Sequence, residues 1–395
     1  MSKIINIFKG SIDGISSTIS IFRDSIKFTF GDEVYVFDLE ARPIFMYFND
    51  MLYERGLSGE IIEKKWISLN PPKRFLRRVI DKGEKRDILK YTFNRVGEIL
   101  DILGVKGLYG LEDRLNIDRI WELESEEERF RRIYRPISIL PPDQYLSLVF
   151  QPLEGCPYNK CSFCTFYRDR DFRYKTADEF REHVKEVIEF LGKSILIRRR
   201  IFLADANALF ADTEQLLEYI KIIREYIDRG SIEGFYSFSD YFTVYKTVYE
   251  LKTLRSEGYK RVYIGLESGS DDVLKILSKP GPAERSLELV KRLKEAGITV
   301  GIIILIGAGG REYYDEHVMK TIKILNAMPL DKRDIIYYSK LKIHSDSEYY
   351  KISREYGLTE LDDEEMNMQI EDIRRGLKHI EKPIQAIYDI DETIY

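Results

Sequence analysis

The sequence has 395 residues, and its formal charge at pH 7 is only -5. Its length exceeds the size at which a single core usually stops growing, which predicts a main domain and a smaller one. The low net charge gives no overall reason to expect an anionic membrane or a nucleic acid as a partner. We expect a cytoplasmic protein with no membrane partner, because no apolar stretch resembles a signal peptide or is long enough to span a bilayer.

Residues 1–135 are expected to fold as a small α+β domain of unknown role. The segment Ser25–Asp38 alternates apolar and polar residues around Gly31-Asp32, which is typical of a β-hairpin. From Pro72 to about Leu103 the pattern is helical and begins with a basic stretch. A solvated helix face is the commoner meaning of such a stretch, so nucleic acid is neither indicated nor excluded as a partner. Prolines mark a domain boundary near residue 136.

Beyond this boundary, strand-like and helix-like segments alternate regularly. The predicted strands are Tyr145–Gln151, Arg200–Ala204, Gly234–Ser239, Arg261–Gly265, Ile298–Ile306 and Asp334–Ile343, and the predicted helices are Thr176–Leu191, Thr213–Arg229, Thr243–Glu257, Ala283–Ala296 and Tyr313–Met328. Nearly continuous apolar strands separated by helices indicate an α/β fold with a parallel sheet. Both an open doubly wound sheet and a partial barrel fit this pattern. Residues 346–395 are expected to form a C-terminal extension, with a closing helix at Glu364–His379.

All three cysteines lie close together, as Cys156, Cys161 and Cys164, directly after the first of these strands. Thiolates favour zinc, copper(I) or iron–sulfur clusters. Structural zinc normally takes four protein ligands, and no histidine lies near the three cysteines in the sequence. A four-iron cluster held by three cysteines fits the count without a missing ligand. A zinc site and unliganded thiols with a packing or redox role are the alternatives.

The cysteine loop and two later motifs resemble the radical S-adenosylmethionine (radical SAM) superfamily over about residues 139–350. The usual family spacing is Cys-x3-Cys-x2-Cys, so this loop has one extra residue. The stretch Ile264-Gly265-Leu266-Glu267-Ser268-Gly269-Ser270 resembles the branch of coproporphyrinogen dehydrogenase-like and Elongator-like enzymes, and Ile304–Gly310 is similar to the family's turn beside the adenine. The resemblance implies a partial (β/α)6 parallel barrel over residues 136–345, with the smaller α+β domain before it and a C-terminal helix after it.

The resemblance also implies cofactors and the residues that hold them. Cys156, Cys161 and Cys164 would bind a [4Fe-4S] cluster, and an electron donor such as ferredoxin or flavodoxin would reduce it. The cofactor S-adenosylmethionine (SAM) would be contacted by residues at strand ends, namely Phe163, Asp205, Asn207, Ser237, Ser239, Glu267, Ser268 and Gly307. Among these, Asp205 and Asn207 belong to the stretch that replaces the family's Gly-Gly-Glu. For Phe163, Asp205, Glu267 and the serines of the third strand, ordinary packing, capping or solvation is the alternative.

The sequence therefore predicts a radical SAM enzyme. It would cleave SAM reductively to a deoxyadenosyl radical, which abstracts hydrogen from an unknown small or macromolecular substrate. No catalytic side chain is singled out. Because every cysteine is used, a second cysteine-held cluster cannot form, and two-cluster methylthiotransferases fit poorly. The alternative is a non-catalytic zinc or iron–sulfur module with an RNA-binding or assembly role.

Overall fold

The computed structural model describes residues 3–68, 74–105, 108, 110–345, 347–378, 382–392 and 394–395. The chain divides into two compact units. Unit 1 takes Met1–Ser138, Lys185–Arg199 and Asp391–Tyr395, and unit 2 takes Ile139–Val184 and Arg200–Ile390. Among the described residues, no helix has both the length and the apolar character needed to cross a bilayer.

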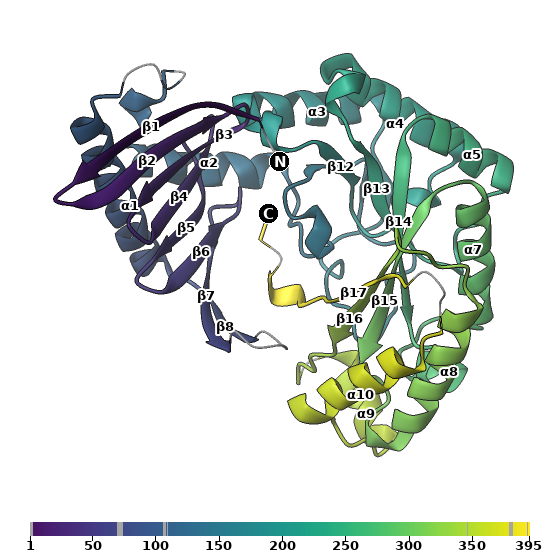
Figure 1. Cartoon of the computed structure of the whole chain (residues 1–395). Coiled ribbons are helices and arrows are strands. Elements are labelled where there is room, and N and C mark those ends of the chain that lie inside the picture. The colour runs from purple at the N-terminus through teal and green to yellow at the C-terminus, as the bar shows by residue number, and fades with distance from the viewer. Residues whose placement is uncertain are drawn as a thin grey trace. The chain divides into compact units, whose positions relative to one another are not determined.

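Unit 1 is built on an antiparallel sheet in which each strand pairs with the next along the chain (Figure 1). Its strands are β1 Ile4–Ile12, β2 Ile15–Phe22, β3 Ser25–Phe30, β4 Glu33–Asp38, β5 Pro43–Phe48, β6 Met51–Arg55, β7 Ile61–Ser68 and β8 Arg74–Val79, and its helices are α1 Lys82–Leu103 and α2 Arg119–Ile133. The predicted hairpin around Gly31-Asp32 is confirmed as β3 and β4.

The prediction of one continuous helical segment from Pro72 to Leu103 is wrong in its first part. Arg74–Val79 forms β8, the last strand of the sheet, and α1 begins only at Lys82. The side chain of Asp81 sets this start, because it accepts hydrogen bonds from the backbone N–H groups of Gly83 and Glu84. The basic stretch is therefore divided between a strand and a helix. The first two residues of the predicted helical segment, 72 and 73, lie outside the described part of the chain.

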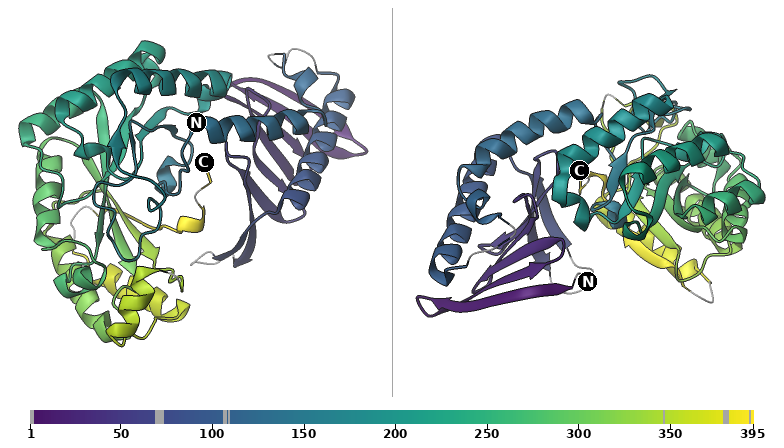
Figure 2. Two further views of the ribbon diagram at one scale, coloured as in Figure 1. Left: turned by 180° about the vertical axis from the view of Figure 1, so that it is seen from behind. Right: turned by 90° about the horizontal axis from the view of Figure 1, so that it is seen from above.

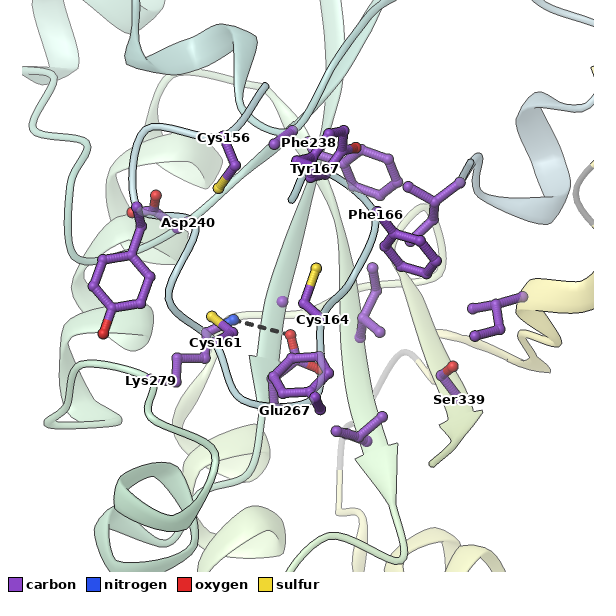
Figure 3. A pocket seen from close by; sticks show the side chains of 18 of the residues that line it. Cys156, Cys161, Cys164, Phe166, Tyr167, Phe238, Asp240, Glu267, Lys279 and Ser339 are labelled. Atoms are coloured by element: carbon purple, nitrogen blue, oxygen red, sulfur yellow. Dashed lines mark hydrogen bonds and ion pairs between the residues drawn. The ribbon is translucent and has the colours of Figure 1, made fainter. Parts of the chain in front are cut away.

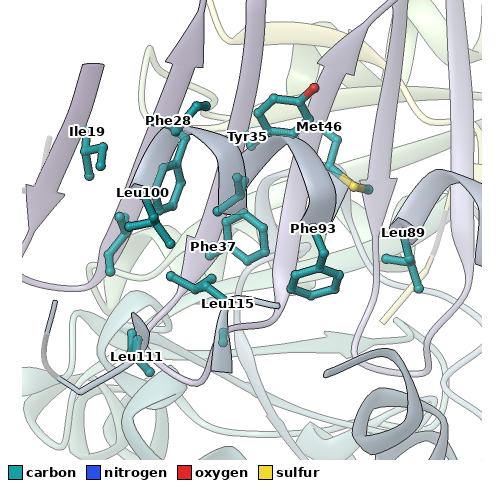
Figure 4. Close-up of a cluster of buried hydrophobic side chains, with 14 of the residues drawn as sticks. Ile19, Phe28, Tyr35, Phe37, Met46, Leu89, Phe93, Leu100, Leu111 and Leu115 are labelled. Atoms are coloured by element: carbon teal, nitrogen blue, oxygen red, sulfur yellow. The ribbon is translucent and has the colours of Figure 1, made fainter. Parts of the chain in front are cut away.

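One face of the unit 1 sheet forms the core against α1 (Figure 4). Side chains of a strand point alternately to the two faces, so every second residue reaches this core. The sheet contributes mainly Ile19, Phe28, Tyr35, Phe37 and Met46, and α1 contributes Leu89, Phe93 and Leu100. The helical residues recur at the spacing of one helix face, which explains why α1 covers the sheet.

Unit 2 contains a seven-stranded parallel sheet in the order β17-β16-β15-β14-β13-β12-β9. The strands are β9 Leu148–Phe150, β12 Arg200–Leu203, β13 Gly234–Ser239, β14 Tyr259–Glu267, β15 Thr299–Ile306, β16 Ile335–Lys340 and β17 Ile384–Ile387. The helices are α3 Ala177–Leu191, α4 Thr213–Tyr226, α5 Val248–Ser256, α6 Asp271–Ile276, α7 Glu284–Glu295, α8 Tyr314–Ala327, α9 Glu348–Glu355 and α10 Asp363–Gly376. Helix α3 is shared, because its residues from Lys185 onward belong to unit 1. Helices α4, α5, α7 and α8 follow one another along the outer side of the curved sheet (Figures 1 and 2).

This architecture confirms the predicted α/β class with a partial parallel barrel. All six predicted strands are present in their expected order. The sequence prediction missed β17, a short strand that pairs in parallel with β16. Only four residues long and directly preceded by Pro383, β17 is too short to give a clear periodic signal. The predicted closing helix is α10, and the predicted end of that helix, His379, lies outside the described residues.

A small ladder closes the base of the cysteine loop. Strands β10 Leu153–Glu154 and β11 Arg173–Tyr174 pair antiparallel, so the chain leaves the sheet after β9 and returns before α3. The side chains of Glu154 and Arg173 form an ion pair at 3.0 Å across this ladder. The three cysteines thus lie in a loop whose two ends are fixed to each other.

Candidate active site

A cavity of about 190 Å³ lies at the carboxyl ends of the parallel strands of unit 2 (Figure 3). All three cysteines line it. The strand ends contribute Ser239 from β13, Glu267 from β14 and Ser339 and Lys340 from β16. Because ligands of parallel α/β folds bind beyond the carboxyl ends of the strands, this cavity is the candidate active site.

Hydrogen bonds within the loop shape the cysteine segment. Asn159 has a left-handed backbone with φ of 46°, and its N–H donates to Sγ of Cys156 at 3.3 Å. Left-handed backbone is more accessible to asparagine than to most residues. The Arg168 guanidinium donates to the carbonyl oxygens of Cys161 at 2.9 Å and Cys164 at 3.2 Å. These bonds fix the backbone on which the thiols are placed.

A second set of hydrogen bonds fastens the loop to the end of α6 and the turn after it. Ser162 donates through its N–H to the carbonyl of Leu277 and through its hydroxyl to that of Ile276. The Tyr158 hydroxyl donates to the carbonyl of Ser278 at 2.7 Å. The cysteine loop and the turn after α6 therefore form one connected wall of the cavity.

The three thiols are reactive only as thiolates, and burial works against that form. Burial raises the pKa of Cys161 to about 12 and that of Cys164 to about 11, and it also raises the pKa of Cys156. Without metal the thiols are protonated at neutral pH, so metal binding must release protons. Within the described part of the chain, no three His, Cys, Asp or Glu side chains are arranged so that they could bind one metal ion together. In a cluster, by contrast, each cysteine binds a different iron.

Glu267 and Lys279 form a buried ion pair beside Cys161 (Figure 3). Nζ of Lys279 donates to Oε1 of Glu267 at 2.9 Å, and the side chains are only 7% and 9% exposed. Burial lowers the pKa of Lys279, but the charges of Glu267 and Cys161 outweigh it, so the pKa lies above its ordinary value and the ammonium is retained. The site thus holds one fixed cation and one carboxylate side by side.

The backbone of β14 is deformed to bring this carboxylate into the cavity. Glu267 has φ of 60°, and the pairing of β14 with β15 shifts register between Gly265 and Glu267. A Cβ atom on Gly265 would lie 2.3 Å from Oε1 of Glu267, so a side chain there would displace the carboxylate from its present position. A left-handed non-glycine residue at a strand bulge is costly, and such deformations concentrate at functional sites.

Asn207 presents an unsatisfied acceptor in the cavity lining. Its amide nitrogen donates to Oδ2 of Asp240 at 2.8 Å and to the Thr243 hydroxyl at 3.3 Å. These bonds orient the amide, and buried Oδ1 has no hydrogen-bond partner among the residues that the structure describes. A buried acceptor without a partner is costly unless a ligand satisfies it.

The predicted site residues divide into two groups. Those that line the cavity are the three cysteines, Phe163, Asn207, Ser239 and Glu267. Asp205, Ser237, Ser268 and Gly307 are not among its lining residues. Asp205 instead accepts from the Gly155 N–H at 3.1 Å, from the Gln151 amide at 2.9 Å and from Arg170 at 3.3 Å. It therefore holds the residue directly before Cys156.

The other three residues outside the cavity lining form hydrogen bonds elsewhere. The Ser237 hydroxyl is bonded to the Tyr259 hydroxyl at 2.6 Å. Ser268 is buried against Nδ1 of His317 at 2.8 Å. Gly307 donates its N–H to Gln369 in α10 at 2.8 Å. These contacts secure the strand ends around the cavity.

Sequence reasoning missed the role of Lys279 and the contribution of the C-terminal segment. Lys279 lies in the turn after α6, in Leu277-Ser278-Lys279-Pro280, and its charge directly before a proline was the available signal. Tyr388 and Ile390, which follow β17, also line the cavity. No sequence signal pointed to them, since β17 itself was not predicted.

Residues 150–325 match the sequence model of the Radical SAM superfamily. This part of the chain is a radical SAM domain. It contains all three cysteines together with Glu267 and Lys279. Its cofactors are a [4Fe-4S] cluster and SAM. The cavity fits these two cofactors. It is lined by three thiols, a fixed cation, a carboxylate and an unsatisfied amide oxygen.

Known proteins similar to this chain include a curated relative and several solved structures. The tRNA-2-methylthio-N(6)-dimethylallyladenosine synthase of Methylacidiphilum infernorum (isolate V4) is 25% identical over 275 residues, which cover 67% of this chain and 55% of that protein. This chain thus spans about half the length of that relative. Coproporphyrinogen III oxidase from Escherichia coli is 13% identical with a TM-score of 0.41, covering 59% of this chain and 53% of that one. The FeFe-hydrogenase maturase HydG from Carboxydothermus hydrogenoformans is 14% identical with a TM-score of 0.37, covering 76% of each chain.

Proposed function

We propose that this protein is a radical SAM enzyme that reductively cleaves SAM to a deoxyadenosyl radical for hydrogen abstraction from an unidentified substrate. One observation carries this proposal. The three thiols and the buried Glu267–Lys279 pair line the same cavity, at the strand ends of a radical SAM domain. The stretch Ile264–Ser270 supports the branch of coproporphyrinogen dehydrogenase-like and Elongator-like enzymes.

The charges of the cavity match the ends of SAM. Cys156, Cys161 and Cys164 would hold the cluster, which supplies the electron for cleavage when it is bound and reduced. The Lys279 ammonium suits the carboxylate of the methionine part, and Oδ1 of Asn207 suits its amino group. The second oxygen of Glu267 is available to accept from a ribose hydroxyl. We assign Asp205, Ser237, Ser268 and Gly307 to supporting these groups rather than to touching SAM.

Apolar side chains enclose the reacting region. Phe166, Phe238, Ile303 and Leu305 line the cavity between the cysteine loop and the sheet. An apolar enclosure excludes water, strengthens the ion pairs inside it and protects a reactive intermediate from side reactions. Phe163 adds a flat ring, which suits packing against adenine.

The outer side of the cysteine loop suits an acidic electron donor such as ferredoxin or flavodoxin. Lys160 and Arg168 are exposed, and the structure shows neither of them within ion-pair distance of a described carboxylate. Arg168 touches the carbonyls of two cysteines, so a donor bound there would be close to the cluster. Opposite charges accelerate such encounters.

Deoxyadenosine formation tests the proposed function. Protein reconstituted anaerobically with iron and sulfide, given SAM and dithionite, should form deoxyadenosine, detected by chromatography and mass spectrometry. Cys161→Ala should abolish the product, and Lys351→Gln, an exposed substitution on α9, should not affect it. Protein that binds zinc alone and forms no deoxyadenosine would overturn the proposal.

A further inference from the structure

The face of the unit 1 sheet opposite α1 carries two rows of residues that cross all eight strands. Cross-strand pairing gives the first row as Lys9, Thr18, Thr29, Val34, Tyr47, Leu52, Lys64 and Arg77, and the second as Ile7, Ser20, Lys27, Val36, Phe45, Glu54, Ile62 and Val79. We call these two rows the open face. The core residues Phe28, Tyr35 and Met46 occupy the alternate positions and face α1.

The open face is apolar in its middle and cationic toward both edges. Strands β4 to β6 contribute the partly exposed Val34, Val36, Phe45, Tyr47 and Leu52. Toward the edges, β1 and β3 contribute Lys9 and Lys27 on one side, and β7 and β8 contribute the buried Lys64 and the exposed Arg77 on the other. Its single carboxylate, Glu54, is paired with Lys64 at 2.8 Å. The face is therefore net positive, although the whole chain carries a formal charge of -5.

This composition differs from that of a face that meets only water. The solvated face of an antiparallel sheet normally carries polar residues, and a contiguous apolar patch normally marks a binding surface. Pairing with a second copy of the face would bring two net positive surfaces together, which is unfavourable. A purely apolar partner would make no use of the charges of Lys9 and Lys27. The combination suits a polyanion that also exposes flat apolar groups.

Single-stranded nucleic acid has this chemistry. Phe45 and Tyr47 lie two residues apart on β5, so their Cα atoms are about 7 Å apart along the strand and their side chains belong to the same face. Rings presented by a sheet stack on unpaired bases, while cations beside them contact phosphates. A duplex buries the faces of its bases and would leave both rings without a partner.

Hydroxyl groups on the same face favour RNA over DNA. Thr18 and Thr29 are bonded to each other at 2.6 Å, and Ser20 lies in the neighbouring row, between Ile7 and Lys27. Hydroxyls both donate and accept, and they can pair with the 2′-hydroxyl that distinguishes RNA. We propose that the open face binds single-stranded RNA, with Phe45 and Tyr47 stacking on bases and Lys9 and Lys27 contacting phosphates.

This binding site goes beyond the proposed function and does not depend on it. All of its residues belong to unit 1, and binding needs neither SAM nor a reductant. Loss of RNA binding and loss of deoxyadenosine formation are measured separately, so failure of one proposal is distinguishable from failure of the other. Where both hold, an RNA is the class of macromolecular substrate to test first.

The test measures binding of the full chain to a fluorescein-labelled 12-nucleotide oligouridine by fluorescence anisotropy. We expect saturable binding that weakens as salt rises from 50 to 200 mM. Loss of one stacked base is worth about 1–3 kcal/mol, so Phe45→Ala and Tyr47→Ala should each weaken binding by about 5- to 150-fold. Both side chains are only partly buried, and circular dichroism melting of each variant will show that it folds.

Charge variants and controls complete the experiment. Each phosphate contact of a single strand contributes about 0.7 to the slope of log affinity against log salt. The double variant Lys9→Gln, Lys27→Gln loses two such contacts, so its slope should be about 1.4 smaller. Tyr249→Ala and Lys252→Gln, on α5 of unit 2, should leave binding unchanged. Equal affinity for a duplex, no binding by the wild type, or unchanged binding by the folded Phe45→Ala and Tyr47→Ala variants would each overturn the proposal. A dimer that these two variants dissociate would instead assign the face to a second copy.

Discussion

The buried pair of Glu267 and Lys279 gives the sharpest prediction, because each residue is held in the site by the other. Their side chains are 9% and 7% exposed, and the Nζ–Oε1 distance is 2.9 Å. Removing one partner of a buried pair leaves an uncompensated charge and costs about 3–5 kcal/mol of stability. Glu267→Gln and Lys279→Met should each cost that much. The double variant carries no unpaired charge and should cost less than either single variant.

The double-mutant cycle is measured by native-state hydrogen exchange of the β14 amides in cluster-free protein. Exchange of strand amides reports the opening of unit 2, whereas tryptophan fluorescence would not, since Trp66 and Trp121 both belong to unit 1. We expect a coupling energy of about 3 kcal/mol or more between the two residues, as for contacting buried charges. Additive effects, or single variants that each cost less than about 1 kcal/mol, would refute the inference of a buried coupled pair.

The same pair separates stability from SAM binding. A hydrogen bond to a charged group is worth about 1.5–3 kcal/mol, so Lys279→Met should weaken SAM binding by about 10- to 150-fold. Equilibrium dialysis of labelled SAM against cluster-loaded protein measures this loss. The double variant should recover stability but not SAM affinity. Recovery of both would show that Lys279 serves only to neutralise Glu267.

Three further predictions concern pH, loop position and electron supply. Burial lowers the pKa of His317 to about 4 in the folded chain, below the value of about 6.5 in an unfolded chain. The unfolded state therefore binds more protons, and the stability of the folded state falls as pH drops from 7 toward 4. Between pH 7 and 5 the wild type should lose about 2 kcal/mol more than His317→Gln in urea unfolding, and equal losses would contradict this origin. Asp205→Asn should reduce the iron retained per chain while the SAM affinity of each loaded cluster stays unchanged. Unchanged iron content with weaker SAM binding would instead show that Asp205 contacts SAM directly. Lys160→Glu should slow deoxyadenosine formation several-fold with flavodoxin but not with dithionite, and equal slowing with both would place the effect at the cluster.

Local sequence patterns were sufficient to predict the framework of unit 2. Strands β12 to β16 are buried on both faces, so their apolar runs are long enough to recognise. Three cysteines close together in one loop likewise identified metal chemistry before any folding was considered. Strand β17 and the start of α1 were missed because β17 is short and β8 lies directly before a helix of similar composition.

The composition of the candidate site was only partly predictable. Asn207 and Glu267 follow predicted strands and Ser239 ends one, and the parallel sheet brings these strand ends to one edge. Lys279 reaches the same cavity only because α6 turns the chain back against the cysteine loop. Asp205 follows a strand equally closely, yet its carboxylate is used by Gly155, Gln151 and Arg170. Position after a strand therefore does not tell which side chain lines the cavity and which one holds the cysteine loop.

The sequence by itself determined the alternation of strands and helices, the metal-binding chemistry and the resemblance to a radical SAM domain, because each depends on residues that are near one another along the chain. Only the tertiary structure decided which charges meet and which side chains share a face. The Glu267–Lys279 pair depends on a left-handed residue at a bulge, and the open face depends on the register of eight strands. A shift of one residue in that register would exchange the two faces of a strand, so its binding chemistry is a property of the folded sheet.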